Sequence, residues 1–385
     1  MTVTAIATHL RDRRLRLLGI AQTQLGLFLN YNTVAYADSV ATEVCNALDA
    51  ADIPLHPSLR VASDYQSVFF CRFLPLRSFK EFWQRGFYPL NHHNCIGLTP
   101  IMVQGRRWFG YEDKEIEINT INWLTNKGFM QQTAKDPLKL GLNVYATGYH
   151  YAGAMSAGGL SNFFVDVNIS DAVQFLESTV LIRDNCLCWC NEEGHGCSPI
   201  KTFLKNYTHN ERGEDRPTRA RHFFLHHGLP DTSGGEKLSP FVKEALRLLT
   251  FEALEMTHTC CSYDQIYGHD HDNLVSEENL DEMAIFHCDP DIVSEIRSCD
   301  KQQASAILLE DLMAEFTEQI QRAAPGPYAF EEFIYTHWRR RISGLYTPDP
   351  TVVNGLRQHQ AFQGLGSPLI VRTGEYVIYE IPPWY

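Results

Sequence analysis

The sequence predicts a mostly α-helical protein: an array of helix pairs, followed by a C-terminal helical region and a short terminal β-hairpin. Three observations predict this fold. Apolar residues recur near the helical period along much of the chain. Turns that run from Gly to Thr-Pro or Ser-Pro precede several of these helical segments. Near the end, two β-like runs lie on either side of Thr373-Gly374-Glu375, which is a hairpin pattern.

Composition is that of a globular protein with an acidic region. The chain has 385 residues, of which 44% are hydrophobic and 21% charged, so it can bury a sizeable core. Its net charge of −13 argues against binding to nucleic acid or to anionic membranes, since both require clustered Lys and Arg. Residues 264–320 carry fifteen acidic and two basic side chains. Such a tract is a solvated helical face in most proteins, and its functional interpretation is a docking surface for a basic protein partner.

The N-terminal residues predict an intracellular protein, cytoplasmic or nuclear. A basic patch at residues 11–16 precedes an apolar run from Leu17 to Leu29 that contains Gln22 and Gln24. That run is too short and too polar for a membrane span, and an amphipathic helix is favoured over a targeting peptide. In a reducing compartment the eleven cysteines are expected to be thiols or metal ligands rather than disulfides.

Changes in pattern along the chain predict five regions. Helical spacing extends to about Leu29 and again from Val34 to Ala51, and the Pro-containing run 53–57 ends this first part. The regions are an N-terminal helical segment (1–60), helix-pair repeats that include a cysteine-rich segment (61–204), a polar loop or insertion (205–240), a C-terminal helical region (241–345) and a tail with a β-hairpin (346–385).

The first repeat turn is the best defined. Gly86 can take the left-handed conformation that ends a helix, and the following run reaches Asn94-Cys95-Ile96-Gly97-Leu98-Thr99-Pro100. Asn94 and Gly97 favour a tight turn, and Thr99 and Pro100 are typical of the first positions of a helix. The turn therefore predicts a helix that begins at residue 100.

Two later segments repeat this pattern. Thr147-Gly148 and Ser198-Pro199 occupy the place of Thr99-Pro100, at spacings of 48 and 51 residues. Ankyrin repeats have a period of about 33 residues, so each unit would need an insertion. The third unit would include a helix at 170–181. An unrelated all-α domain with chance Gly-x-Thr-Pro turns is the alternative.

The C-terminal region predicts three helices and a further helix start. Ser239-Pro240 begins the first, and the spacing of apolar residues places the others at 302–323 and 330–345. Asp289-Pro290-Asp291 is a further helix-start pattern, with acids near the positive end of the helix dipole.

Several of these features together resemble a family of uncharacterised fungal proteins with divergent ankyrin-like repeats. The resemblance covers roughly residues 65–345 and rests on the turn at 91–101, the Cys-x-Cys-x-Cys segment and the run Thr257-His258-Thr259-Cys260-Cys261. It implies a divergent ankyrin-like fold and an interaction role, and it supplies no catalytic site.

The cysteine-rich segment, residues 184–200, is the strongest candidate site. Zinc takes four Cys or His ligands in structural sites, and the predicted ligands are Cys186, Cys188, Cys190 and Cys197. If the segment is a strand, the first three side chains share a face. Further candidate ligands are His195, His258, Cys260 and Cys261. Two alternatives remain: reduced cysteines packed as small apolar residues, and a catalytic or redox thiol.

The predicted function is a non-catalytic interaction scaffold or transcriptional co-regulator, stabilised by zinc and bound to a protein partner. The chain contains no phosphate loop, dinucleotide fingerprint, nucleophile elbow or His-Glu-x-x-His pattern. The alternative is an enzyme of fungal specialised metabolism, of an acyl- or aminoacyl-transfer type. His258, Cys260 and Cys261 would then be its catalytic candidates, because a thiol and an imidazole can form a nucleophile–base pair.

Overall fold

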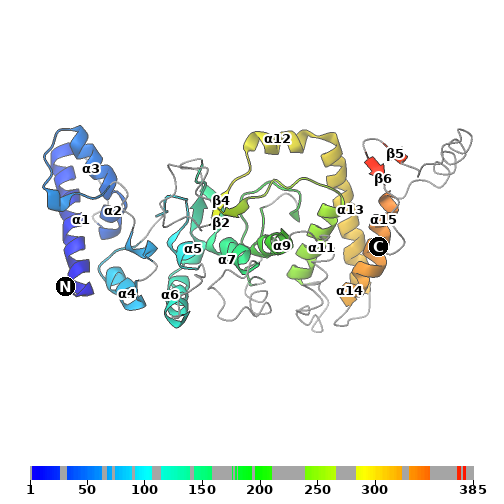
Figure 1. Ribbon diagram of the computed structural model, residues 1–385, viewed down its shortest axis with the longest axis horizontal. Coiled ribbons are helices and arrows are strands. Elements are labelled where there is room, and N and C mark those ends of the chain that lie inside the picture. The colour runs from blue at the N-terminus through cyan, green and yellow to red at the C-terminus, as the bar shows by residue number, and fades with distance from the viewer. Residues whose placement is uncertain are drawn as a thin grey trace, which may run out of the picture. The chain divides into compact units, whose positions relative to one another are not determined.

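A computed structural model places most of the described residues in helices, as the sequence predicts (Figure 1). The described residues fall into two compact units, residues 1–327 and 328–385. The ranges that the structure describes are 2–26, 33–62, 67–71, 74–88, 92–105, 114–138, 143–157, 176, 178–179, 181–192, 196–209, 239–265, 283–322, 329–346, 371–373 and 376–378. Most of the predicted helix 170–181 and most of the predicted loop 205–240 lie outside these ranges.

The first unit holds most of the helices. In chain order its elements are α1 (Val3–Leu25), α2 (Val34–Ser39), α3 (Ala41–Ala50), the 3-10 turns η1 (Pro57–Leu59) and η2 (Val68–Phe70), α4 (Leu76–Gln84), α5 (Pro100–Gln104), α6 (Lys114–Asn126), η3 (Phe129–Gln131), β1 (Thr133–Lys135), β2 (Asn143–Thr147), α7 (Gly148–Ala157), α9 (Pro199–His209), α11 (Pro240–Ala253), β3 (Ser262–Gln265), β4 (Met283–Phe286), α12 (Pro290–Ser298) and α13 (Asp300–Arg322).

The N-terminal helices follow the prediction with two differences. Thr2 caps α1 by accepting the Ala5 N–H, and the helix ends at Leu25, before the expected Leu29, with Gly26 as its C-cap at a positive φ of 61°. The expected single helix from Val34 to Ala51 is divided at Val40 into α2 and α3. Arg14 of α1 and Asp38 of α2 form a buried ion pair with a 2.8 Å N–O distance, which fixes α2 against α1.

The predicted turn before residue 100 is present. Asn94 Oδ1 accepts the N–H groups of Ile96 and Leu98, and Gly97 has a φ of +77°. A Cβ atom on Gly97 would lie 1.9 Å from the carbonyl oxygen of Lys135, so the position requires glycine. The turn therefore packs directly on the hairpin β1–β2, an antiparallel pair that the repeat pattern did not predict.

Helices that follow these turns pack on one another in chain order. The neighbouring pairs are α5 with α7, α7 with α9, α9 with α11 and α11 with α13. Figure 1 shows α5, α7, α9, α11 and α13 in a row within the first unit. At the α7–α9 contact a Cβ on Gly153 would lie 2.6 Å from the carbonyl oxygen of Pro199, so the missing side chain permits the close approach of the two helices.

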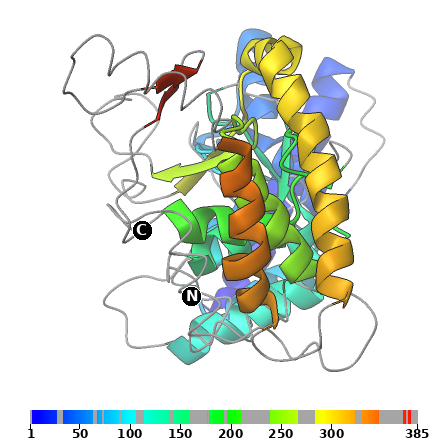
Figure 2. The ribbon, with the colours of Figure 1, turned by 90° about the vertical axis from the view of Figure 1, so that its right-hand side faces the viewer.

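The helix starts predicted at residues 239–240 and 289–291 are also present. Ser239 Oγ accepts the Val242 N–H at the start of α11, and Asp289 accepts the Asp291 N–H at the start of α12. The predicted helix 302–323 is α13, whose buried face is formed by Leu309, Leu312, Met313 and Phe316. Figure 2 shows the sharp bend between α12 and α13.

The second unit contains a helical run and a hairpin. The predicted helix 330–345 is observed as α14 (Ala329–Phe333), a π-helical turn (Ile334–Trp338) and α15 (Arg339–Tyr346). The predicted hairpin is β5 (Val371–Thr373) with β6 (Tyr376–Ile378), antiparallel, with Thr373 opposite Tyr376. Among the described helices, none combines the length and apolar character that crossing a bilayer requires.

Candidate metal centre

Asp184 organises the cysteine segment, as residues 184–200 are called below. Its Oδ1 atom accepts the N–H of Cys186 at 3.0 Å and that of Cys197 at 2.6 Å, and its own N–H donates to the carbonyl oxygen of Cys197 at 3.0 Å. Burial and the adjacent Cys197 thiol raise the pKa of Asp184 to about 7, although the two N–H donors oppose the shift. These bonds bring the two ends of the segment together and set Cys186 beside Cys197.

Gly196 allows this closure. A Cβ atom at this position would lie 1.8 Å from the carbonyl oxygen of Asp184, a distance that no side chain can tolerate. The glycine before Cys197 is therefore a requirement of the site, because the backbone on each side of the closure must be in direct contact.

Three cysteine side chains point inward: Cys186 and Cys188 from an extended stretch, and Cys190 from the turn that follows it. All three side chains are buried, whereas Leu187 between them is 53% exposed. The segment is not a β-strand, since residues 182–188 have no regular secondary structure. Cys186 and Cys188 nevertheless alternate with exposed residues as in an extended chain, so their thiols face the same side.

The segment that follows α11 contributes His258 and Cys260 to the site. The helix ends at Ala253, and the run 257–261 follows it outside the helix. His258 Nδ1 lies 3.8 Å from the Cys188 sulfur and 3.6 Å from the Cys260 sulfur. The Cys260 sulfur lies 3.3 Å from the sulfurs of both Cys190 and Cys197.

Six side chains thus form one buried cluster, which we call the thiol cluster. Within it, the ligand atoms of Cys188, Cys190, His258 and Cys260 all lie within 4.8 Å of one another. A second set with the same property consists of Cys186, Cys197 and Cys260. The cluster is compatible with a bound metal ion. Its members are Cys186, Cys188, Cys190, Cys197, His258 and Cys260.

The thiols of the cluster shift one another's pKa values in opposite directions. Neighbouring thiols, Cys186 first among them, raise the pKa of Cys260 well above its usual value, and burial adds to this. Hydrogen bonds from Cys186, Cys190 and Cys260 lower the pKa of Cys197. Without a cation, some sulfurs can ionise only at the expense of others. A metal ion removes this competition, because it binds thiolates and displaces their protons.

N–H donors surround the sulfurs. The Asn191 side chain lies 3.4 Å from both Cys186 Sγ and Cys197 Sγ, and the backbone N–H of Thr259 lies 3.4 Å from Cys188 Sγ. A neutral thiol is a weak acceptor, whereas donors directed at ligand atoms are typical of the shell around a metal site. This arrangement favours thiolates over thiols packed only as apolar groups.

His258 has a defined orientation. Burial lowers its pKa, but the Cys188 thiol and the Glu252 carboxylate outweigh burial, so the pKa is raised overall. Its Nε2 atom lies 3.9 Å from Glu252 Oε1, on the side away from the sulfurs. Nδ1 is therefore the atom presented to the cluster, with Nε2 facing a carboxylate, as is common for metal-binding histidines.

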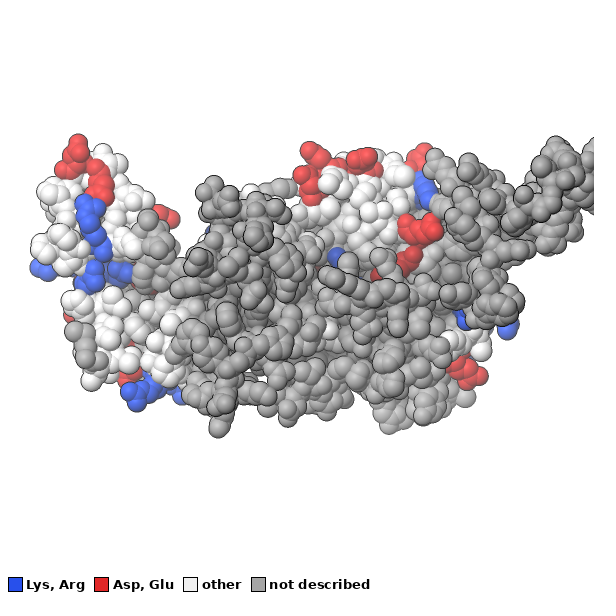
Figure 3. All heavy atoms as spheres, viewed as in Figure 1, with Lys and Arg blue, Asp and Glu red and all other residues white. Residues whose placement is uncertain are grey.

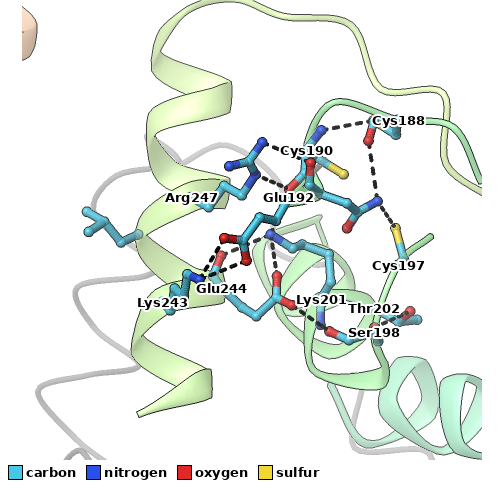
Figure 4. A network of polar contacts seen from close by, with 12 residues as sticks. Cys188, Cys190, Glu192, Cys197, Ser198, Lys201, Thr202, Lys243, Glu244 and Arg247 are labelled. Atoms are coloured by element: carbon cyan, nitrogen blue, oxygen red, sulfur yellow. Dashed lines mark hydrogen bonds and ion pairs between the residues drawn. The ribbon is translucent and has the colours of Figure 1, made fainter. Parts of the chain in front are cut away.

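Buried cations fix the cysteine segment to the helices. Lys201 Nζ of α9 donates to the carbonyl oxygen of Cys190 at 2.9 Å and pairs with Glu244 of α11 at 2.7 Å. Arg247 of α11 donates to the carbonyl oxygens of Trp189, Cys190 and Asn191 and pairs with Glu310 of α13. Figure 4 shows these side chains converging between α11 and the segment.

One predicted ligand, Cys261, is placed differently from the cluster. Cys261 directs its sulfur toward the carbonyl oxygen of Val144, 4.0 Å away, and belongs to the main apolar core. Successive side chains of an extended chain point to opposite sides, which separates it from Cys260. His195 lies outside the described residues.

Several residues that hold the site were not identified from the sequence. These residues lie close in sequence to the cysteines or to a predicted helix, and they are Asp184, Asn191, Lys201 and Arg247. Polar residues at such positions are equally typical of solvent-exposed sites. The one available signal was Lys201, since it falls beside Ile200 and Phe203 on the apolar side of a predicted helix, where a lysine needs a partner.

Comparisons with protein-family models, with curated proteins and with solved structures find no match for this chain.

Proposed function

We propose that the chain is an intracellular interaction protein whose helical array is held by a structural zinc ion. Cys188, Cys190, His258 and Cys260 would be the four ligands. The observation that carries the proposal is the mutual proximity of their four ligand atoms, all within 4.8 Å of one another. Three thiolates and one imidazole are a common ligand set of structural zinc sites.

The distances fit an ion at the centre of the set. In a tetrahedron with zinc–sulfur bonds of about 2.3 Å, neighbouring sulfurs are about 3.8 Å apart. His258 Nδ1 lies 3.8 Å from Cys188 Sγ and 3.6 Å from Cys260 Sγ, and the Cys190 and Cys260 sulfurs are 3.3 Å apart. Small outward shifts of the sulfurs would admit the ion. Four protein ligands also leave no open position for a substrate, which supports a structural role.

The proposed ion would join segments that are far apart in the chain. Cys188 and Cys190 precede α9, and His258 and Cys260 follow α11, seventy residues later. Because α9 packs on α11, a metal at this point would hold the helix pair and its connecting segments together. Soft thiolate ligands favour zinc over magnesium or calcium, which prefer oxygen.

An interaction role is supported by the helices themselves. A row of helices in which each packs on the next is the plan of repeat proteins, which bind partners along an extended surface. The stacking of α5, α7, α9, α11 and α13 is what supports a divergent ankyrin-like array, the fold that the resemblance implies. A scaffold or transcriptional co-regulator in the cytoplasm or nucleus is the role that this proposal assigns.

The proposed partner is a basic protein. On the face drawn in Figure 3, acidic side chains gather over α12 and α13. The exposed acidic residues of α12, α13 and the residue before α12 include Asp289, Asp291, Glu295, Glu310 and Asp311. Rim charges of this kind act mainly on the association rate and on its salt dependence. Affinity capture with quantitative mass spectrometry should therefore find partners that wild type retains at low salt and releases at high salt. The double variant D291K/E295K should fail to retain these partners at low salt.

The enzyme alternative would use the same residues in another way. His258 would serve as a base and Cys260 as a nucleophile, since Nδ1 and Sγ lie 3.6 Å apart. If both bind zinc, neither lone pair is free for acyl or aminoacyl transfer. Metal binding therefore also decides between the two functions.

The test is the metal content of full-length protein purified without chelator. We expect zinc in wild type, and loss of zinc with a lower melting temperature in Cys188→Ser. The matched control is Cys299→Ser, since Cys299 is exposed and lies outside the thiol cluster. Wild type that contains no zinc, cannot be loaded with it and has five titratable thiols in the cluster would refute the proposal.

A further inference from the structure

The thiol cluster contains more ligands than one ion requires. Cys186 and Cys197 are 1% and 3% exposed, and their sulfurs are 3.3 Å apart. They belong to a second set of mutually close ligand atoms, in which the third member is Cys260. Cys260 is therefore shared by both sets.

We propose that the cluster holds two zinc ions, bridged by the thiolates of Cys260 and Cys190. This inference rests on the proposed zinc site and adds a second ion to it. The first ion would have Cys188, Cys190, His258 and Cys260 as ligands, and the second Cys186, Cys197, Cys190 and Cys260.

Ligand counting requires two bridges. Two tetrahedral ions need eight metal–ligand bonds, and the cluster has six side chains. A thiolate can bind two metals because its sulfur has more than one lone pair, whereas Nδ1 of His258 has one. Six ligands supply eight bonds when two of the five thiolates bridge.

The positions of the sulfurs select Cys260 as one bridge. Cys260 Sγ lies 3.3 Å from Cys190 Sγ on one side and 3.3 Å from Cys197 Sγ on the other, and Cys260 is the member that both sets share. Ligand counting assigns the second bridge to Cys190. Its thiol neighbours those of Cys188 and Cys197, but it is not a member of the second set, so its sulfur would have to shift toward that set when the second ion binds.

The N–H donors divide the sulfurs that do not bridge into the same two sets. Cys188 Sγ lies 3.5 Å from the N–H of Cys190 and 3.4 Å from that of Thr259. Cys186 Sγ and Cys197 Sγ share the Asn191 side-chain amide, at 3.4 Å each. These three sulfurs are the terminal thiolates of the proposed arrangement, which keep lone pairs for hydrogen bonds.

The second ion adds no net charge to the buried site. One Zn²⁺ with three thiolates and a neutral imidazole carries a charge of −1. Entry of a second Zn²⁺ releases two protons from Cys186 and Cys197 to solvent, and the product, two Zn²⁺ with five thiolates, also carries −1. Burying uncompensated charge is expensive, so the second ion can be accommodated without a further counter-charge. Lys205, whose pKa the cluster sulfurs raise against the effect of burial, balances the remaining charge.

The experiment is native mass spectrometry of the full-length chain after reconstitution with zinc. Two ions per chain are expected. One ion overturns the bridged pair and leaves the single structural site intact, and no ion overturns both proposals. Cys186→Ser should then bind one ion, while Cys299→Ser should bind two. Two ions retained in Cys186→Ser would place the second ion elsewhere and overturn the inference.

A second measurement avoids substitutions that prevent folding. Wild type loaded with ¹¹³Cd should give two cadmium resonances that are coupled to each other through the shared sulfurs. Two resonances without mutual coupling would overturn the bridges.

Discussion

The sulfurs of Cys190 and Cys260 lie 3.3 Å apart, although seventy residues separate them in the sequence. The intervening chain includes α9 and α11, which pack against each other, so the thiol contact closes a loop around that helix pair. Anything that loosens the contact should loosen the helices as well.

Metal removal should destabilise the protein. A ligand that binds only the folded state stabilises it by about 4 kcal/mol when its concentration is a thousand times its Kd. We expect a chelator to lower the melting temperature measured by circular dichroism and added zinc to restore it. An unchanged melting curve after complete zinc removal would contradict a structural role.

The identity of the ligand at position 258 should determine metal retention. His258→Cys keeps a zinc-binding group there, whereas His258→Ala leaves three ligands of the proposed site. We expect zinc to be retained in the first variant and weakened by at least tenfold in the second, as measured by competition with a chromophoric chelator. Equal affinities in the two variants would show that His258 is not a ligand.

Gly196→Ala should open the base of the cysteine segment. The new Cβ would meet the carbonyl oxygen of Asp184 at 1.8 Å, and overpacking of this kind costs about 1–3 kcal/mol. Denaturant unfolding should show this loss, together with weaker zinc binding. Gly19→Ala in α1 is the matched control, because a Cβ there has nothing within 4 Å, and it should be neutral or stabilising.

Lys201→Met should destabilise far more than Lys243→Met. Lys201 is fully buried between the carbonyl oxygen of Cys190 and Glu244, and removing one partner of a buried pair costs about 3–5 kcal/mol. Lys243 pairs with Glu192 at the surface, where such pairs contribute about 0–1 kcal/mol. Similar unfolding free energies for both variants would mean that Lys201 does not anchor the segment.

His150 should make the stability depend on pH. It is fully buried, with Nδ1 accepting the Thr147 N–H at 3.1 Å and Nε2 donating to the carbonyl oxygen of Cys197 at 2.9 Å, which requires the neutral ring. Burial lowers its pKa from 6.5 to about 4. The folded state therefore binds the proton less tightly than the unfolded state does. Its contribution is complete above pH 6.5 and decreases as the pH falls toward 4.

The matched variant for this titration is His150→Gln, which offers an acceptor and a donor but does not titrate. Between pH 7 and pH 5, wild type should lose about 2 kcal/mol more unfolding free energy than the variant. The comparison of the two proteins removes the acid sensitivity of the metal ligands, which both share. Parallel losses in the two proteins would show that His150 is not the group responsible.

Residues close together in the chain are enough to set the local structure of this protein. Helix starts at Ser239-Pro240 and Asp289-Pro290, the left-handed turn at Gly97 and the terminal hairpin all depend on residues within a few positions of one another. Local steric preferences and capping hydrogen bonds fix such features wherever the segment lies. The inward alternation of Cys186 and Cys188 is local in the same sense.

Which side chains share a site depends instead on how the helices pack. Nothing in the spacing of the cysteines selects Cys260 over its neighbour Cys261, and the packing of α9 on α11 brings the first to the cluster and turns the second into the core. The buried partners of the segment, Lys201 and Arg247, are likewise chosen by where their helices pack. Contacts between residues seventy positions apart depend on many packing interactions along the chain. A sequence pattern of a few residues therefore does not predict them.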